Sequence, residues 1–170
     1  TGTNGKTTTA FLLAQASDFL GRRGWYVGTL GHGHPGNVRD AGLTTPDAVT
    51  VQRRLAEARD EGASTLGLEV SSHALDQDRV AGVNFDTAVF TNLTRDHLDY
   101  HRDMDEYFEA KSRLFTDYLV DSAKSHKAAV IYGDDPRGPE LMERARAAGL
   151  QVWSYGDSAR WDVHPLGVEK

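Results

Sequence analysis

The chain has 170 residues, a length typical of one domain, and its hydrophobic content of 39% fits a folded globular protein. Its 25 acidic and 19 basic residues give a formal net charge of −6, and no apolar run approaches the roughly 20 residues of a membrane-spanning helix, so neither nucleic acid nor a membrane is expected as a partner. Cysteine is absent, which excludes a disulfide framework, a thiol nucleophile and a thiolate zinc site.

Strands and helices are predicted to alternate along the chain. Apolar residues recur at helical spacing from Thr7 onward, and Gly24 suits the end of this first helix. The predicted helices cover residues 7–23, 47–61, 103–120 and 139–148, and residues 71–84 are expected to hold a short helix or a loop. The predicted strands cover residues 25–30, 65–70, 86–91, 128–132 and 151–155. The Gly- and His-rich residues 31–46 are expected to form a loop.

This alternation predicts an α/β fold in which a mainly parallel sheet carries helices on both faces. Ligands of such sheets bind at the carboxyl ends of the strands, and several polar motifs of this sequence fall at those ends. Neither a repeat nor a linker divides the chain. Residues 1–170 are therefore expected to belong to a single domain.

The opening motif Thr1-Gly2-Thr3-Asn4-Gly5-Lys6-Thr7 has the features of a phosphate loop that leads into a helix. Glycines let backbone N–H groups surround the phosphates, the lysine reaches the terminal phosphates, and the hydroxyl of the next threonine binds Mg²⁺. The alternative is an ordinary turn that begins a helix. Because a phosphate loop normally follows a strand and none precedes Thr1, we expect the chain to be a piece of a longer protein.

Two groups of metal-binding residue types follow predicted strands. Glu69 stands in the apolar stretch 65–70, where a carboxylate is costly to bury, and it could help to hold Mg²⁺ near the phosphate loop. Residues 94–101 contain two histidines and two aspartates, including His97, and these side chains are common metal ligands. A solvated glutamate and a solvated charged loop are the alternatives, and the residues alone leave them open.

Lys111 interrupts the apolar stripe of a predicted helix. Met104, Phe108, Phe115 and Tyr118 share this stripe by their spacing. A lysine in such a place must extend its amine to the edge of the apolar surface, find a carboxylate, or lose its positive charge. Carbamylation by CO₂ would turn it into an anion able to bind a metal, but the spacing alone favours the first alternative.

Two hydroxyl-rich motifs precede helical segments. The residues Thr44-Thr45-Pro46 and Ser71-Ser72-His73 could each act as a helix cap. Gln77 and Arg79 follow the second motif and could be ordinary surface residues. These motifs are ambiguous when each is taken alone.

Taken together, the motifs resemble the Mur ligase family, the ATP-dependent ligases that assemble peptidoglycan precursors. The resemblance covers residues 1–136, in the phosphate loop and in motifs that begin at Thr44, Glu69 and Thr91, and it is greatest to the member that adds the third peptide residue. It implies that residues 1–170 are an incomplete central ATP-binding domain, without the N-terminal UDP-binding domain and the C-terminal domain. It also implies a cytoplasmic enzyme.

The resemblance implies a role for each motif. ATP would be bound by Gly2, Thr3, Asn4, Gly5, Lys6, Thr7 and Thr8. Magnesium would be bound by Thr7, Glu69, His97 and a carbamylated Lys111. The UDP-muramoyl dipeptide would be bound by Thr44, Thr45, Ser71, Gln77 and Arg79. The catalytic residues would be Lys6, His97 and Lys111.

The implied reaction joins a diamino acid, meso-diaminopimelate or L-lysine, to UDP-N-acetylmuramoyl-L-Ala-D-Glu through an acyl phosphate. Folylpolyglutamate synthase and other relatives would share the loop and the metal residues, but the motifs at Thr44 and Ser71 argue against them. A GTPase should carry an Asn-Lys-x-Asp motif, which does not occur in this sequence. A nucleotide-binding module that is inactive by itself is the remaining alternative.

Overall fold

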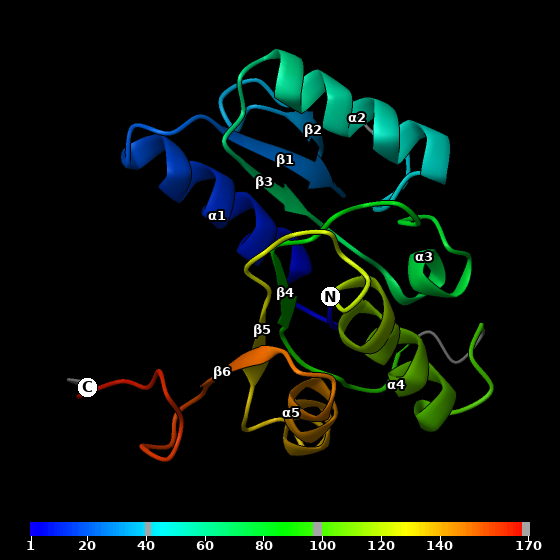
Figure 1. The fold of residues 1–170 in the computed structure, drawn as a ribbon, viewed down its shortest axis with the longest axis vertical. Coiled ribbons are helices and arrows are strands. Elements are labelled where there is room, and N and C mark those ends of the chain that lie inside the picture. Colours follow the sequence, from blue (N-terminus) through cyan, green and yellow to red (C-terminus); the bar gives the residue numbers. More distant parts are fainter. Residues whose placement is uncertain (40–41, 97–99, 168–170) are drawn as a thin grey trace. The chain divides into compact units, whose positions relative to one another are not determined.

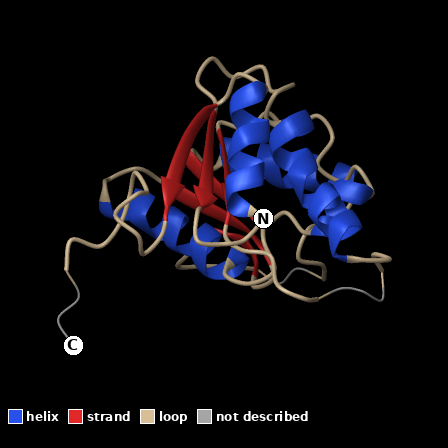
Figure 2. Cartoon of the chain, turned by 90° about the horizontal axis from the view of Figure 1, so that it is seen from below, coloured by secondary structure: helices blue, strands red, loops and turns tan. Residues whose placement is uncertain are grey.

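The computed structural model describes residues 1–39, 42–96 and 100–167. The chain divides into two compact units, one formed by Gly5–Gly82 and the other by Thr1–Asn4 together with Val83–Lys170. Both units contain strands and helices (Figures 1 and 2).

The unit Gly5–Gly82 contains a three-stranded sheet. Its strands lie in the order β2 (Gly31–Gly33), β1 (Gly24–Gly28) and β3 (Thr65–Leu68). Strand β1 runs parallel to β3 and antiparallel to β2. The helices of this unit are α1 (Lys6–Phe19), α2 (Ala48–Asp60) and α3 (Ser72–Asp76).

Helices α1 and α2 cover opposite faces of this sheet (Figure 1). Successive side chains of a strand point to opposite faces. Tyr26 therefore packs with Ala10 and Ala14 of α1, whereas its neighbours Trp25 and Val27 form a cluster with α2. Because both faces are covered, β1 is buried along its whole length, which confirms the prediction of helices on both faces.

The second unit contains a parallel sheet of β4 (Thr87–Phe90), β5 (Ala128–Tyr132) and β6 (Gln151–Tyr155), in that order. The first residues of the chain pair with β4 as a further short strand would. The Thr1 backbone nitrogen donates to the Val89 carbonyl (2.7 Å), the Thr91 N–H to the Thr1 carbonyl (3.0 Å), and the Thr3 N–H to the Asn92 carbonyl (3.0 Å). Helix α5 (Gly138–Ala147) packs on β5 and β6.

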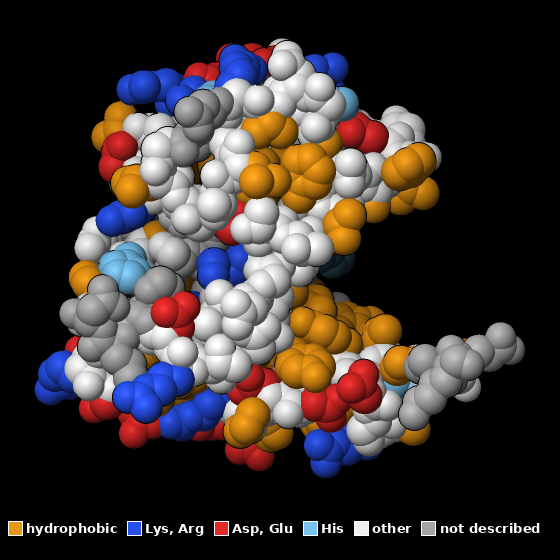
Figure 3. Space-filling view, turned by 180° about the vertical axis from the view of Figure 1, so that it is seen from behind, with side chains coloured by type: hydrophobic (Ala, Val, Ile, Leu, Met, Phe, Trp, Pro, Cys, Tyr) orange, Lys and Arg blue, Asp and Glu red, His pale blue; other side chains and the backbone are white. Residues whose placement is uncertain are grey.

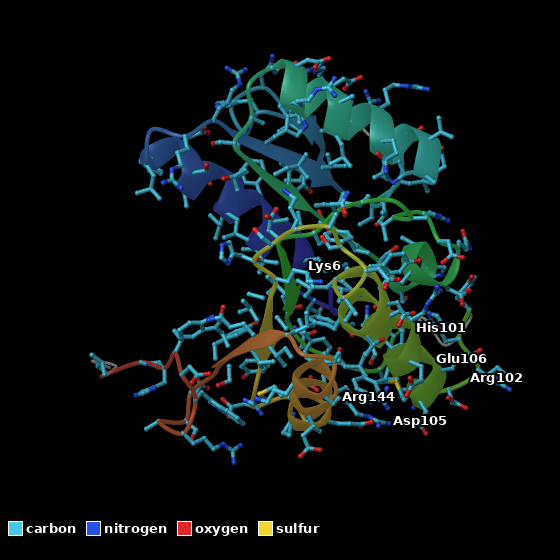
Figure 4. The ribbon with its side chains drawn as sticks, in the orientation of Figure 1. Lys6, His101, Arg102, Asp105, Glu106 and Arg144 are labelled. Atoms are coloured by element: carbon cyan, nitrogen blue, oxygen red, sulfur yellow. The ribbon has the colours of Figure 1, made fainter. Side chains whose placement is uncertain are left out.

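Helix α4 (Met104–Arg113) continues without a break into a π-helical turn, η1 (Leu114–Tyr118). It is joined to α5 by ion pairs between Arg137 and Asp105 and between Arg144 and Glu109 (2.7 Å), and Figure 4 labels residues of both helices. The two guanidinium groups also lie over the Phe108 ring, 4.8 and 5.1 Å from its centre. These contacts fix the helix that carries Lys111.

Most predicted elements are confirmed, and three differ. The predicted loop 31–46 begins with a strand, β2, which exists because His32 and its neighbours pair with β1. The predicted helix 103–120 changes from an α-helix to a π-helix at Leu114. Finally, the described strands pair as two three-stranded sheets, of which one contains an antiparallel strand. The assignment of residues 1–170 to a single incomplete domain stays a prediction.

Charged side chains of both signs are mixed on the face of the protein shown in Figure 3. Within the described parts of the chain, no helix has both the length and the apolar character needed to cross a membrane.

Candidate active site

The predicted phosphate loop leads directly into α1, whose first residue is Lys6 (Figure 4). Gly5 stands before the helix with a φ of 81°, a left-handed conformation that favours glycine. Gly5 has no side chain that could cap the first N–H groups of α1. Thr7 and Thr8 lie in this first turn. The backbone is therefore suited to hold an anion.

The first half of the loop is fixed by the residues that follow β4. The Thr3 hydroxyl accepts a hydrogen bond from the Thr94 N–H (2.9 Å) and donates to the Thr94 carbonyl (3.2 Å). Asn4 and Asn92 bond to each other twice, N–H to side-chain oxygen (2.9 Å) and side-chain amide to carbonyl (3.1 Å). The Thr91 hydroxyl donates to the Asn4 carbonyl as well (2.6 Å). Residues 91–94 thus support the loop, a role that sequence reasoning missed.

Glu69 follows β3 directly and is buried, with 1% of its surface exposed. Its Oε2 accepts hydrogen bonds from the hydroxyls of Thr7 (2.9 Å) and Thr29 (3.3 Å). Its Oε1 accepts from the Thr29 N–H (2.9 Å) and, through a short hydrogen bond, from the Tyr26 hydroxyl. A solvated glutamate is therefore excluded, and two of the residues predicted to bind Mg²⁺, Thr7 and Glu69, are in contact.

Lys111 is also buried, again with 1% of its surface exposed. Its Nζ donates a hydrogen bond to the Gly2 carbonyl (3.0 Å) and lies 4.4 Å from the centre of the Tyr107 ring. Burial raises the pKa of the Tyr107 hydroxyl, which is 3.2 Å from the Thr3 hydroxyl. The alternative that the spacing favoured, an amine extended to the edge of an apolar surface, is wrong. Lys111 instead reaches the backbone of the phosphate loop.

The predicted substrate-binding residues converge on Thr45 within the unit Gly5–Gly82. The buried Thr45 hydroxyl donates to the Glu69 carbonyl (2.8 Å) and accepts from the Ser71 N–H (3.1 Å). Arg79 donates to the Thr45 carbonyl (3.0 Å) and twice to the Gln77 side-chain oxygen (2.9 and 2.6 Å). The structure thus links these side chains to the backbone next to Glu69.

Thr44 joins the same network through the Thr29 hydroxyl, at 3.0 Å.

Of the two motifs that could have capped a helix, one does so and the other does not. Ser71 does cap α3, because its hydroxyl accepts from the Ala74 N–H (3.2 Å). Helix α2 is capped by Asp47, which accepts from the Thr50 N–H (3.0 Å), and not by the threonines before it. Thr44 and Thr45 therefore need another reason for their positions.

One predicted metal ligand, His97, lies outside the described residues. Within the described ranges, no group of three or more His, Cys, Asp or Glu side chains is placed to hold a metal ion. A pocket near β2 contains none of the predicted site residues and is lined by His32, Gly42, Leu43, Pro46, Asp47, Thr50 and Arg54.

Comparison with known proteins relates this arrangement to one family. The profile of the Mur ligase middle domain matches residues 1–168. The UDP-N-acetylmuramoyl-L-alanyl-D-glutamate–2,6-diaminopimelate ligase of Chromobacterium violaceum is 48% identical over 168 residues, which are 99% of this chain and 33% of that protein. The enzyme of the same name from Xylella fastidiosa is 51% identical over 162 residues, 93% of this chain and 32% of that protein.

A solved structure of a ligase with this name agrees with the fold at a TM-score of 0.83 and 36% identity, over 95% of this chain and 32% of that chain. The chain therefore spans about one third of the length of the relatives that it matches. The profile match over nearly every residue, together with the fold, shows that this chain belongs to the Mur ligase family and corresponds to its middle domain.

Proposed function

We propose that this chain is the ATP-binding part of a cytoplasmic ligase that joins 2,6-diaminopimelate to UDP-N-acetylmuramoyl-L-alanyl-D-glutamate. The names of the two relatives support this acceptor over L-lysine. The observation that carries the proposal is the contact between Thr7 and Glu69 at the start of α1. It joins the threonine of a phosphate loop to a buried carboxylate, as an ATP–Mg²⁺ site requires.

The residues present fit Mg²⁺, which prefers oxygen ligands. Thr7 would supply its hydroxyl and Glu69 its carboxylate, and His97 and a carbamylated Lys111 complete the set that the family resemblance implies. Bound Mg²⁺ would neutralise charge on the phosphates of ATP. Gly2, Thr3, Asn4, Gly5, Lys6, Thr7 and Thr8 would hold these phosphates through backbone N–H groups, hydroxyls and the Lys6 ammonium.

The chemistry begins when the substrate's D-glutamate carboxylate attacks the γ-phosphorus of ATP. ADP leaves, and the carboxylate becomes an acyl phosphate. The amine of diaminopimelate then attacks the acyl carbon, and the tetrahedral adduct collapses to an amide as inorganic phosphate departs and a proton is lost. Because two anions approach each other in the first step, the positive charge of Lys6 lowers its barrier.

Carbamylation of Lys111 is a further part of the proposal. The neutral amine attacks CO₂, a C–N bond forms and one proton is lost, so the side chain becomes a carbamate anion. Burial supports this reaction because it favours the neutral amine of a lysine. The hydrogen bond to the Gly2 carbonyl is compatible with the product, since the carbamate nitrogen keeps one N–H.

The residues gathered around Thr45 would bind the UDP-muramoyl dipeptide, and Arg79 would pair with its carboxylate or phosphate. Arg79→Ala in the full-length enzyme should raise the KM for this substrate more than the KM for ATP. An equal change in both constants would contradict the assignment. Steady-state kinetics with each substrate varied in turn measure the two values.

The overall proposal is tested with Lys6→Ala in the full-length enzyme, with phosphate release followed in the presence of diaminopimelate or L-lysine. Turnover should be abolished in this variant. The matched control is Lys124→Ala, because Lys124 is an exposed lysine that pairs with Asp86. Near-normal turnover of Lys6→Ala, or a wild-type enzyme that does not use diaminopimelate, would refute the proposal.

A further inference from the structure

A tyrosine that no motif contains is bonded to the proposed magnesium ligand Glu69. Tyr26 lies in the middle of β1, with no exposed surface. Its ring packs on α1 and meets the Phe11 ring edge to face, with 5.3 Å between ring centres. Its hydroxyl donates the short hydrogen bond to Glu69 Oε1.

The four hydrogen bonds to Glu69 are shared equally between its two carboxylate oxygens. Oε1 accepts from the Tyr26 hydroxyl and the Thr29 N–H. Oε2 accepts from the Thr7 hydroxyl at the start of α1 (2.9 Å) and, at a longer distance, from the Thr29 hydroxyl (3.3 Å). Fixing Oε1 therefore determines the rotation of the carboxylate and keeps Oε2 next to Thr7.

The Tyr26 hydroxyl is itself fixed as a donor. It accepts a hydrogen bond from the Leu30 N–H (3.2 Å), so its own hydrogen is directed to Glu69.

The strand leaves room for this pair at Gly28. A Cβ atom at Gly28 would overlap both Glu69 Oε1 and the Tyr26 hydroxyl. Any residue larger than glycine would push the two groups apart. The contact between Tyr26 and Glu69 thus depends on the residues at two positions of β1, Tyr26 and Gly28. Neither residue belongs to the phosphate loop.

We propose that Tyr26 is a positioning residue that orients the Glu69 carboxylate so that Oε2 serves Thr7 and the magnesium site. This inference rests on the proposed function, because it takes Glu69 and Thr7 as magnesium ligands. It adds a residue that touches neither ATP nor Mg²⁺ and acts through Glu69. The competing explanation is that Tyr26 only fills the core between β1 and α1.

Tyr26→Phe separates these two explanations because it keeps the ring and removes only the hydroxyl. The full-length enzyme is saturated with a non-hydrolysable ATP analogue and titrated with Mn²⁺, and free Mn²⁺ is followed by electron paramagnetic resonance. Tyr26→Phe should weaken Mn²⁺ binding by roughly tenfold, the lower end of the effect of losing a partner of a metal ligand. Saturating Mg²⁺ should restore most of the kcat, whereas a defect of core packing would not respond to the metal.

The matched control is Tyr155→Phe, which removes a tyrosine hydroxyl bonded to the Phe90 carbonyl in the other unit. Its Mn²⁺ affinity should equal that of the wild type. Glu69→Gln reports on the metal site itself. Unchanged Mn²⁺ binding in Tyr26→Phe together with weakened binding in Glu69→Gln would overturn the positioning role and leave the proposed function intact. No change in either variant would overturn both the positioning role and the assignment of Glu69.

Should Tyr26→Phe fail to fold, Gly28→Ala replaces it as the test. This variant keeps every hydroxyl and places a methyl group between Tyr26 and Glu69, so Mn²⁺ binding should weaken in the same direction. Wild-type affinity in Gly28→Ala would refute the proposal.

Discussion

The two units of the chain each bury one charged side chain that was predicted to bind magnesium, and they accommodate it differently. Glu69 receives hydrogen bonds on both oxygens from Thr7, Tyr26 and Thr29. Lys111 donates to the Gly2 carbonyl and lies over the ring of Tyr107. The surroundings of Glu69 stabilise the anion that the proposed function needs, whereas a carbonyl and a ring face both suit a cation.

Glu69 and Lys111 thus differ in how well their surroundings match the negative charge that a magnesium ligand needs. The donors around Glu69 are supplied by the chain, and they hold both oxygens of its carboxylate in place. Under the proposed function, Lys111 would instead have to exchange its positive charge for a negative one by reaction with CO₂. Carbamylation would keep the hydrogen bond to Gly2 and lose the attraction of the Tyr107 ring, so the modified form would depend on a metal to stabilise it.

Replacement of Lys111 should have the largest effect. Lys111→Ala in the full-length enzyme should lower kcat by roughly 100-fold, as expected for a lost metal-holding group, and acetate or formate should restore part of the activity by filling the space with an anion. Lys111→Arg should stay inactive because it keeps a positive charge. Turnover assays with and without added acetate measure both effects. An arginine variant as active as the wild type would show that Lys111 acts as a cation, the charge that the Gly2 carbonyl and the Tyr107 ring favour.

Glu69→Gln should have a smaller effect on turnover, roughly tenfold, and it should not respond to acetate. The glutamine amide turns one end of the side chain into a donor that faces the donors already present, which should lower the free energy of unfolding by about 1–3 kcal/mol. Chemical denaturation and turnover at rising Mg²⁺ concentration measure the two consequences. Rescue by acetate would mean that Glu69, like Lys111, occupies a space that any anion can fill.

Tyr107→Phe should change stability by only about 1 kcal/mol, the usual value of one hydrogen bond. The variant removes the contact between the Tyr107 and Thr3 hydroxyls and keeps the ring beneath Lys111. The carbon resonance of the carbamate, observed after addition of ¹³C-labelled bicarbonate, should therefore have the wild-type intensity. Loss of this resonance would show that the hydroxyl, and not the ring, controls the state of Lys111.

Titration of the buried tyrosine hydroxyls at alkaline pH should show the smallest effect. The pKa values of Tyr26 and Tyr107 are raised in the folded chain, in both cases chiefly by burial. An unfolded chain releases these protons near pH 10, while the native chain still holds them, so stability is complete below that pH and falls as the pH rises above it. Tyrosinate absorbance should show one late-titrating group fewer in Tyr26→Phe than in the wild type, because Tyr107, Tyr132 and Tyr155, whose pKa values are also raised, remain. An unchanged number of late groups in that variant would contradict the prediction.

Local patterns predicted most helices and strands because their apolar periodicity coincides with burial. Strand β2 was missed because Gly31-His32-Gly33 has no residue that favours strands, and its pairing with β1 and with Arg39 orders it. The π-helical turn at Leu114 was missed for a different reason: the apolar residues of the predicted helix keep their spacing through it, so the sequence pattern shows no change there.

The motifs of the candidate site were visible in the sequence, but their supporting residues were not. Glu69 was identified because a carboxylate is unusual in an apolar strand. Tyr26 was not, because a tyrosine in such a strand reads as a core residue. The burial of Lys111 contradicts the interpretation that its spacing favoured, since spacing cannot show that the Gly2 carbonyl lies within reach. The motif that begins at Thr91 was part of the family resemblance, but its position after the predicted strand did not reveal that Thr91 and Asn92 bond to the phosphate loop.

The pairing of Thr1 and Thr3 with β4 has a consequence for the behaviour of the chain in solution. This short segment covers the outer edge of β4, where Val89 and Asn92 offer carbonyl groups and Thr91 offers an N–H. A shortened version that begins at Asn4 would expose these groups as an open sheet edge, which is a template for pairing with another molecule. Such a version should aggregate more readily than the chain that includes Thr1–Thr3, so the start of the phosphate loop should also protect the edge of the sheet.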